Sequence, residues 1–153
     1  MTVQLRAVDH DNFYQVLELK RPEDEAFVAP NVLSLAEAWL YRDTGRVDPR
    51  AIYADRDLIG FLMTYAKEGS RVLDLWRLLI PEKFVNRGYG TSALRLLIEE
   101  AAGSGSYDRI RLSYLPGNDL AEHVYQKVGF RATGEIEDGE VVMAMELDGR
   151  STD

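Results

Sequence analysis

A glycine-containing loop near the middle of the chain has the composition of an anion-binding site. It has the sequence VNRGYGTS, from Val85 to Ser92, and lies between a predicted strand and a predicted helix. The first N–H groups of a helix have no acceptor within the helix, and the helix dipole places about half a positive charge there. Gly88 and Gly90 allow close approach to the main chain, and Arg87 adds a full charge. The loop therefore predicts a phosphate or pyrophosphate site, although an ordinary tight turn with a solvated arginine would have the same residues.

Two other phosphate-binding patterns fit the chain less well. Residues 88–93 satisfy the loose G-x-G-x-x-G/A pattern of dinucleotide-binding folds. That pattern belongs to the first βαβ unit and needs an acid at the end of the next strand, whereas this loop comes past mid-chain and the next strand, RIRLSY, ends in Ser and Tyr. No Gly-Lys pair occurs in the chain, so the loop of nucleotide-hydrolysing enzymes is absent. Dinucleotide binding stays open as an alternative, and nucleotide hydrolysis is disfavoured.

Hydrophobic periodicity predicts the elements that must position this loop. Alternating or continuous apolar runs predict strands at 3–7, 51–54, 58–66, 72–80, 109–114, 130–137 and 141–147. Helical spacing predicts helices at 13–17, from residue 34, from residue 91 to the glycines at 103–105, and at 121–128. The order β-α-α-β-β-β-α-β-α-β-β predicts a single α/β (α+β) domain over residues 1–148, with 149–153 as a frayed tail.

Local signals predict where several helices begin or end. Asp9 or Asp11 is the expected N-cap of the first helix. Ser34 and Glu37 have the S-x-x-E spacing of a capping box, which predicts the start of the second helix. Gly129 is expected to end the last helix in a left-handed conformation.

The composition excludes several classes of protein. With 46% hydrophobic and 29% charged residues, the 153-residue chain can bury a core and has no apolar run long enough to span a membrane. The first residues lack the features of a signal peptide, so we expect a cytoplasmic protein with no membrane partner. The chain has no cysteine, and His10 and His123 are far apart, so neither thiolate catalysis nor a metal site is expected. A formal charge of −8 opposes nucleic-acid binding and favours cationic partners.

Two motifs, in the same order and spacing, resemble those of the GCN5-related N-acetyltransferase (GNAT) family. The acetyl-CoA loop of that family, Q/R-x-x-G-x-G/A after the fourth strand, stands here as VNRGYG, with Val85 where the family usually has Gln or Arg. The family segment N-x-x-A-x-x-x-Y-x-x-x-G-F stands here as Asn118 through Tyr125 to Phe130. The resemblance covers most of the chain. Within the family, the sequence most resembles the bacterial spermine/spermidine (diamine) acetyltransferases, which have a similar fourth strand and a terminal GE-x-VM strand.

The resemblance implies the GNAT fold, a mixed and mostly antiparallel central sheet flanked by about four helices. It also implies direct transfer of an acetyl group from acetyl-CoA to an amine. In that mechanism the backbone of residues 78–80 pairs with the pantetheine arm, and amides of residues 87–91 hold the pyrophosphate. The residues that it implies for binding acetyl-CoA are Leu78, Leu79, Ile80, Val85, Asn86, Arg87, Gly88, Tyr89, Gly90, Thr91, Asn118 and Tyr125.

The resemblance also implies an acid and leads to a candidate base. Tyr125 matches the family tyrosine that protonates the departing CoA thiolate, and a phenol with a pKa near 10 can donate as charge develops on sulfur. A core tyrosine is the alternative, because Tyr125 shares a helix face with Ala121, Val124 and Val128. Relatives of the polyamine type carry an acid where Trp76 stands, so Asp74, two residues away on the same strand face, is the candidate base. A paired or solvent-facing strand acid is the alternative there.

Acidic and aromatic residues indicate a small cationic acceptor. Glu23, Asp24 and Glu25 lie in a segment, expected to be an ordered loop or broken helix, that overhangs the substrate cleft in this fold. Glu37 follows on the next helix, and Trp76 lies on the fourth predicted strand. Carboxylates and aromatic faces bind alkylammonium groups by charge and cation–π contact. We therefore expect acetylation of a polyamine such as spermine or spermidine, although a solvated acidic loop explains the same residues without a function.

Other functions stay open at this point. An enzyme of the same fold could act on a protein N-terminus, a lysine, an amino acid or an aminoglycoside. A noncatalytic acyl-CoA-binding or regulatory module is a further alternative, for which the departures at Val85 and Trp76 are the main indication. The fold often supports homodimers, and no residue in the sequence identifies an interface.

Overall fold

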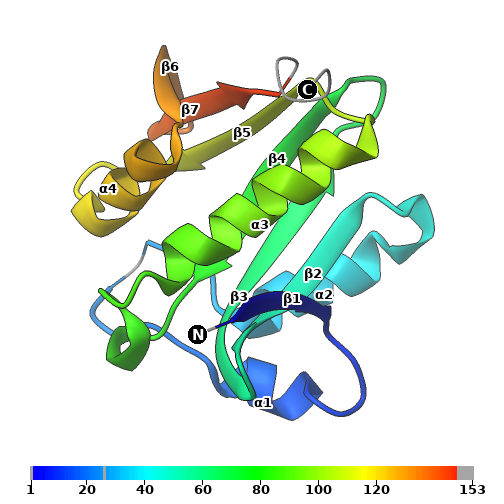
Figure 1. The fold of residues 1–153 in the computed structure, drawn as a ribbon, viewed down its shortest axis with the longest axis vertical. Helices are drawn as coiled ribbons and strands as arrows, with labels where there is room; N and C mark the ends of the chain where they lie inside the picture. The colour runs from blue at the N-terminus through cyan, green and yellow to red at the C-terminus, as the bar shows by residue number, and fades with distance from the viewer. Residues whose placement is uncertain (1, 26, 148–153) are drawn as a thin grey trace.

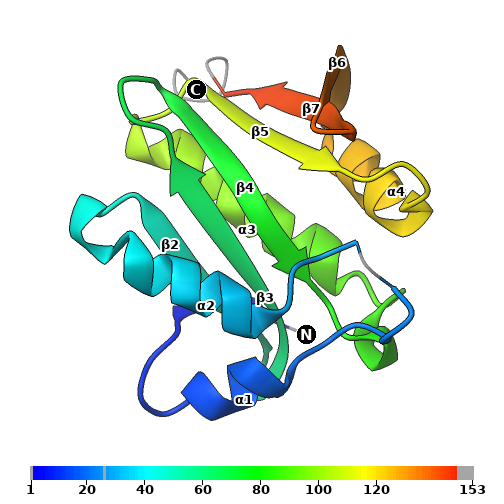
Figure 2. The same ribbon diagram turned by 180° about the vertical axis from the view of Figure 1, so that it is seen from behind.

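The computed structural model describes residues 2–25 and 27–147. In this part of the chain, seven strands form one sheet in the order β1-β2-β3-β4-β5-β7-β6, with helices on both faces (Figures 1 and 2). The strands are β1 (Val3–Ala7), β2 (Val47–Ala54), β3 (Asp57–Ala66), β4 (Val72–Leu79), β5 (Arg109–Tyr114), β6 (Arg131–Glu137) and β7 (Glu140–Glu146). The helices are α1 (Phe13–Glu18), α2 (Asn31–Leu40), α3 (Tyr89–Ser104) and α4 (Asp119–Val128), with short 3-10 helices η1 (Arg42–Thr44) and η2 (Glu82–Phe84). The predicted element order and α+β class are confirmed.

Helices cover both faces of the sheet. Helices α3 and α4 lie on one face, and α1 and α2 lie on the other (Figures 1 and 2). Neighbouring residues of β2 point to opposite faces, so Ile52 belongs to the core under α3 while Ala51 belongs to the core under α1 and α2. Because both faces are covered, the central strands are almost continuously apolar, as the sequence predicted.

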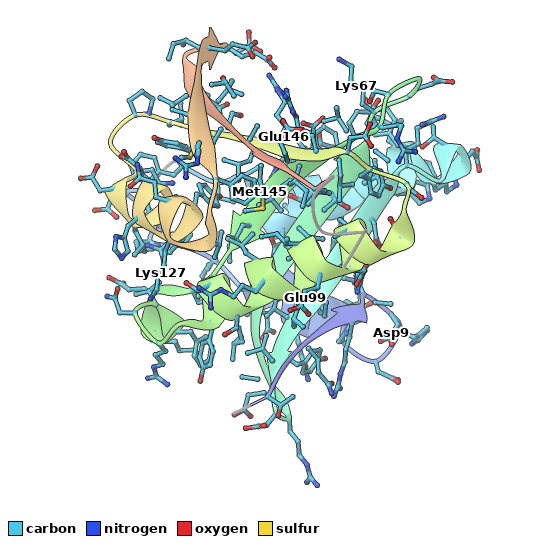
Figure 3. The ribbon with its side chains drawn as sticks, turned by 45° about the horizontal axis from the view of Figure 1, so that its top comes forward. Asp9, Lys67, Glu99, Lys127, Met145 and Glu146 are labelled. Atoms are coloured by element: carbon cyan, nitrogen blue, oxygen red, sulfur yellow. The ribbon has the colours of Figure 1, made fainter. Side chains whose placement is uncertain are left out.

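Helix α3 crosses the sheet as an amphipathic helix. Its buried residues include Leu94, Leu97 and Ile98, whereas Glu99 lies on the exposed side (Figure 3). At the far end of this exposed side, Arg50 of β2 donates from Nη1 to Oε1 of Glu100 at 2.9 Å. This ion pair ties the helix to the N-terminal half of the sheet.

The predicted start of α1 is corrected by the structure. The N-cap is Asn12 and neither Asp9 nor Asp11. The Asn12 side chain accepts from the Asp9 backbone N–H at 2.8 Å and donates to the Ala7 carbonyl at 3.1 Å. It is therefore used to fix the turn between β1 and α1, and it forms no side-chain cap on the helix.

The predicted capping box of α2 is wrong. The helix begins at Asn31, three residues before Ser34, with Pro30 as the N-cap residue. Proline is favoured near helix starts because its φ is already fixed close to the helical value and its missing N–H would have no partner there. Asn31 donates from Nδ2 to the Val16 carbonyl at 2.9 Å, which anchors the new start against α1. Ser34 consequently lies fully buried in the second turn, and Glu37 is turned toward β4, where it pairs with Arg77.

Strand β4 carries the feature that opens the sheet. Met63 of β3 pairs with Arg77 while Thr64 pairs with Leu75, so Trp76 is an extra residue that forms a β-bulge. On its other side, β4 pairs in parallel with β5 only from Val72 to Asp74. Beyond that point the two strands diverge (Figure 2). The sheet therefore splits at its centre, next to the residues that the sequence marks for chemistry.

The C-terminal part forms the far side of this split. Strand β7 pairs with β5 and β6, and α4 packs beside them (Figure 1). Gly129 ends α4 with φ +113, as predicted, and a Cβ there would lie 2.9 Å from Met145 Cε. Met145 points from β7 toward the helices (Figure 3). Glycine is therefore favoured at 129 by the backbone conformation, since the flexible end of Met145 could move away from an added Cβ.

Two remaining predictions concern the ends and the environment of the chain. The tail at 149–153 lies outside the described residues. Within 2–25 and 27–147, no helix is long and apolar enough to cross a membrane.

Candidate functional site

A cavity of about 980 Å³ occupies the split between β4 and β5. Its walls come from the end of β4, the start of α3, the end of β5, α4, the β6–β7 hairpin and part of segment 21–29. Pockets for small ligands commonly measure roughly 300–1,000 Å³, so this cavity can hold a long ligand. It joins residues that are far apart in sequence into one site.

One end of the cavity is the glycine loop and the start of α3. Helix α3 begins at Tyr89, two residues before the predicted start, with Gly88 as N-cap at φ +81. Asn86 also has a positive φ of 62°, so the chain turns sharply before the helix. The cavity lining here is formed by Val85, Asn86, Gly88, Tyr89, Gly90 and Thr91. Arg87 does not line the cavity, and its guanidinium lies 5.8 Å from the Phe84 ring.

The last residues of β4 form the adjoining wall. Leu78 and Ile80 line the cavity, whereas Leu79 is buried and does not. Since β5 pairs with β4 only as far as Asp74, the following β4 backbone faces the cavity instead of a neighbouring strand. The Ile80 carbonyl is the exception, because it accepts from Arg21 Nη1 at 2.8 Å.

Tyr125 projects from α4 into the same cavity. Asn118, the N-cap residue of the same helix, accepts from the Ala121 N–H at 3.3 Å and also lines the cavity. The Tyr125 ring packs between Tyr114 and Phe130 at 6.2 and 6.1 Å. Its hydroxyl makes no hydrogen bond with any described residue. Burial, aided by the nearby Glu140 carboxylate, raises the pKa of this phenol, so its proton is retained at neutral pH.

Asp74 lies on the cavity wall at the last paired residue of β4. Its register partner on β5 is Arg111, and their side chains approach to 3.6 Å between Oδ1 and Nη1. Arg111 also pairs with Glu137 at the end of β6. Burial raises the pKa of Asp74, and Arg111 only partly offsets that effect.

Aromatic rings line the wall beside Asp74. Trp76 and Tyr65 both face the cavity, and their ring centroids are 5.6 Å apart. Tyr41 adds a third ring, 6.2 Å from Trp76. Arg77 lies over Trp76 at 4.9 Å and pairs with Glu37 at 2.6 Å. Glu37 is therefore held by an arginine and does not line the cavity.

The acids of segment 21–25 are distributed differently from the prediction. Glu25 lines the cavity, but it is held by Arg21 through an ion pair of 2.8 Å. This pairing lowers the pKa of Glu25. Glu23 and Asp24 do not line the cavity. Of the five residues predicted to bind the acceptor, the structure brings Trp76 and Glu25 to the cavity.

Sequence reasoning missed the residues on the far wall. Arg111 of β5 and three acids of the β6–β7 hairpin, Glu137, Asp138 and Glu140, line the cavity. No short motif marks them, because they reach the site only through strand register across the split sheet. Among the described residues, no group of three or more histidine and acidic side chains is arranged to hold a metal ion.

Comparisons with known proteins agree with this geometry. Residues 12–130 match the model of the Acetyltransferase (GNAT) family. A spermine/spermidine N(1)-acetyltransferase of Bacillus subtilis (strain 168) is 30% identical over 157 residues, covering 96% of this chain and all of that protein. A probable spermine N(1)-acetyltransferase of Bacillus subtilis subsp. natto is 29% identical over the same share of both chains.

Solved structures share the fold at lower identity. The aminoglycoside acetyltransferase AAC(6')-Ib in complex with coenzyme A has a TM-score of 0.78 at 21% identity, with 96% of each chain covered. The spermidine N-acetyltransferase from Vibrio cholerae, in complex with CoA and spermine, has a TM-score of 0.76 at 15% identity, covering 95% of this chain and 96% of that one.

The chain belongs to the GNAT acetyltransferase family, and it is an N-acetyltransferase whose acyl donor is acetyl-CoA. The residues present fit this donor. A left-handed glycine at the start of a 16-residue helix suits a pyrophosphate, and the uncovered β4 backbone suits an extended amide-bearing arm. The Val85 departure leaves the backbone groups of the loop unchanged, because they do not depend on that side chain.

Proposed function

We propose that this enzyme acetylates a primary amine of a polyamine such as spermine or spermidine. The observation that carries the proposal is a single cavity that joins an anion-binding helix start to a wall of carboxylates and aromatic rings. The names of the two Bacillus relatives, which match nearly the whole chain, support the same acceptor class.

Acetyl-CoA would be held by the α3 start and the end of β4. Amides of residues 87–91 would hold the pyrophosphate, with the Arg87 charge nearby, and the backbone of 78–80 would pair with the pantetheine arm. Asn86, Leu78 and Asn118 would line its path. The bound thioester supplies an activated acetyl group.

Asp74 is the proposed base. A primary amine is mostly protonated at neutral pH and must lose a proton before it can attack a carbonyl carbon. Asp74 lies in the cavity with a carboxylate that is half-buried and weakly paired. It accepts the proton, directly or through a water molecule, and the nitrogen lone pair then forms the new C–N bond.

Tyr125 is the proposed acid. As the C–S bond breaks, the sulfur takes the electron pair and needs a proton. The Tyr125 hydroxyl holds that proton in the cavity and has no competing hydrogen bond with a described residue. A raised phenol pKa keeps it protonated at the pH at which it must act.

The acceptor is attracted by the charge of the cavity wall. Each arginine that lines the cavity, Arg21, Arg77 or Arg111, is paired with a carboxylate. The pairing cancels much of the repulsion of these arginines toward a cation. Over the whole lining, six acids (Glu25, Asp74, Asp119, Glu137, Asp138 and Glu140) outnumber four cations, of which Lys127 is the fourth. Trp76 and the carboxylates of the cavity would contact the ammonium groups, whereas Glu23, Asp24 and Glu37 would act only through their charge.

A thiol-release assay with acetyl-CoA tests the proposal. The acceptors are spermine, spermidine, putrescine, lysine, a peptide with a free N-terminus and an aminoglycoside. We expect kcat/KM for spermine or spermidine to exceed that for every other class by at least tenfold. A preference for the peptide or the aminoglycoside would contradict the polyamine assignment while leaving acetyl transfer intact.

A further inference from the structure

Arg111 joins three strands at the point where the sheet splits. It lies on β5 in register with Asp74 of β4, the last such pair before the strands diverge. Its two guanidinium nitrogens contact different acids, since Nη1 lies 3.6 Å from Asp74 Oδ1 and Nη2 pairs with Glu137 Oε2. All three side chains line the cavity. The triad is therefore part of the reaction chamber.

The division of the Arg111 charge is unequal. Arg111 donates a direct hydrogen bond to Glu137, whereas its contact with Asp74 is an ion pair of 3.6 Å. Each acid is contacted through one oxygen, so the shorter contact is the stronger one. Glu137 thus competes with Asp74 for the same cation, and Asp74 is left only partly compensated in a half-buried position.

Few other charged groups act on Asp74. On β3, its register partner is Tyr65, and Lys67 follows just beyond that strand (Figure 3). Lys67 and Arg111 favour the ionised carboxylate, whereas Glu137 from β6 opposes it. On the α2 side, Glu37 and Arg77 are paired with each other. Arg111 and Glu137 are therefore the main pair of opposed groups that set the charge environment of Asp74.

We propose that Arg111 is a positioning residue for acetyl transfer. Its guanidinium holds the Asp74 carboxylate at the point where β4 and β5 part, while Glu137 neutralises part of the Arg111 charge. This inference rests on the proposed function, in which Asp74 is the base. In that step one N–H bond of the acceptor ammonium breaks, the proton goes to Asp74 Oδ, and the electron pair stays on nitrogen. Glu137 keeps Asp74 basic enough for this transfer, and Arg111 keeps it ionised.

Two substitutions in the triad have opposite consequences. Arg111→Gln removes the cation and raises the pKa of Asp74, because a nearby opposite charge favours the ionised carboxylate. Glu137→Gln removes a repulsive charge and releases Arg111 to Asp74, so the pKa of Asp74 falls. A role confined to strand pairing would move both variants in the same direction, through stability alone.

The experiment measures Asp74 directly and through catalysis. Carbon-13 NMR titration of aspartate carboxyls, assigned by loss of one resonance in Asp74→Asn, gives the pKa of Asp74 in each variant. The acid limb of kcat/KM, with spermidine as acceptor, gives the pKa of the catalytic base. We expect both values to rise together in Arg111→Gln and fall together in Glu137→Gln. Arg111→Lys, which keeps a cation, should return both values toward those of the parent enzyme.

Matched controls come from a neighbouring ion pair that shares strand β5 with the triad. Arg109 of β5 pairs with Glu146 of β7 at 2.5 Å, and neither residue lines the cavity. Arg109→Gln and Glu146→Gln should leave the pKa of Asp74 and the acid limb unchanged. If Asp74→Asn retains the acid limb, the base assignment fails and this inference fails with it. If Asp74→Asn loses the limb but the two triad variants do not move it in opposite directions, the role of Arg111 alone is overturned.

Discussion

Tyr125 is a phenol that the fold surrounds almost completely and yet gives no hydrogen-bond partner among the described residues. Among the described residues, the buried side-chain atoms without a hydrogen-bond partner are Asn31 Oδ1 and Ser34 Oγ. The Tyr125 oxygen is not one of them, so it is open to the cavity that Tyr125 lines and is free to donate to a group bound there. At the residue scale, the proton on this oxygen is the feature that a substitution can test.

Tyr125→Phe should lower kcat by about 10²-fold or more, which is the usual contribution of a positioned general acid. The ring packing against Tyr114 and Phe130 is kept, so the KM for acetyl-CoA and the melting temperature should change little. Steady-state thiol release and thermal unfolding measure these quantities.

Tyr107→Phe is the control, because Tyr107 also packs on the core under α3 but does not line the cavity. It should keep the parent kcat. An unchanged kcat in Tyr125→Phe would remove the acid assignment, whatever the acceptor proves to be.

At the scale of the element, the start of α3 depends on one backbone conformation. Gly88 has φ +81, and nothing lies within 4 Å of the place where its Cβ would be, so the constraint is conformational and not steric. Gly88→Ala should therefore cost about 1–2 kcal/mol of unfolding free energy if the loop keeps its shape. If the loop relaxes instead, the KM for acetyl-CoA should rise while that for the amine changes less.

Gly90→Ala provides a comparison within the same loop. Its φ is not positive, and an added Cβ would meet Val124 Cγ1 at 3.8 Å and Ile80 Cγ1 at 3.9 Å, which are ordinary contacts. Urea unfolding should show no loss of stability for this variant. Equal losses in the two variants would contradict the conformational explanation for Gly88.

The elements themselves were largely predictable, and their ends were less so. The residues of loop 85–92 follow one another in the sequence, as do those of the segment from Asn118 to Phe130. The spacing within each motif was therefore sufficient to find it. The start of α2 was missed because Pro30 and a contact from Asn31 to α1 override the Ser34 pattern. The bulge at Trp76 has no local signal, since it exists only as a mismatch in pairing with β3.

The same reasoning explains what was missed in the site. Arg111 and Glu137 meet Asp74 through the packing of strands β4, β5 and β6, which are separated in sequence by the helices α3 and α4. Glu25 was predicted to bind the acceptor, and the sequence did not indicate that Arg21, four residues earlier, holds its carboxylate. The charged residues could be counted from the sequence, whereas the ion pairs that they form could be identified only from the folded structure.

At the scale of the whole molecule, ion pairs contribute to the response of stability to acid. Arg50 lowers the pKa of Glu100 through a hydrogen bond, and Arg21 does the same for Glu25. A lowered folded-state pKa contributes stability above the unfolded pKa of about 4.3 and loses it as pH falls through the folded value. Asp74 has the opposite sign, because burial raises its pKa, so its ionisation reduces stability as pH rises through the folded value.

Glu100→Gln isolates one part of this response. The Glu100 side chain is 53% exposed, so its pair with Arg50 should contribute less than about 1 kcal/mol at pH 7. We expect the variant to be slightly less stable than the parent at pH 7 and equally stable near pH 3, measured by urea unfolding. Glu99→Gln, on the exposed side of the same helix, should show no such dependence on pH. A deficit that persists at low pH would indicate a packing effect instead of a charge effect.

The divergence of β4 and β5 also affects how this sheet avoids pairing with strands of other chains. An unpaired strand edge is ordinarily a hazard, because another chain can add a strand to it and begin aggregation. Here the open edge of β4 lies inside the sheet, between β4 and β5, where a slender extended ligand fits more easily than a strand with side chains on both faces. One of the two outer edges of the sheet, β6, is exposed along its whole length, but it is interrupted by a bulge and carries Arg131, Glu135 and Glu137. The unpaired backbone edge of β4 is thus enclosed within the molecule, and the outer edge at β6 is charged and irregular, which disfavours the addition of a strand from another chain.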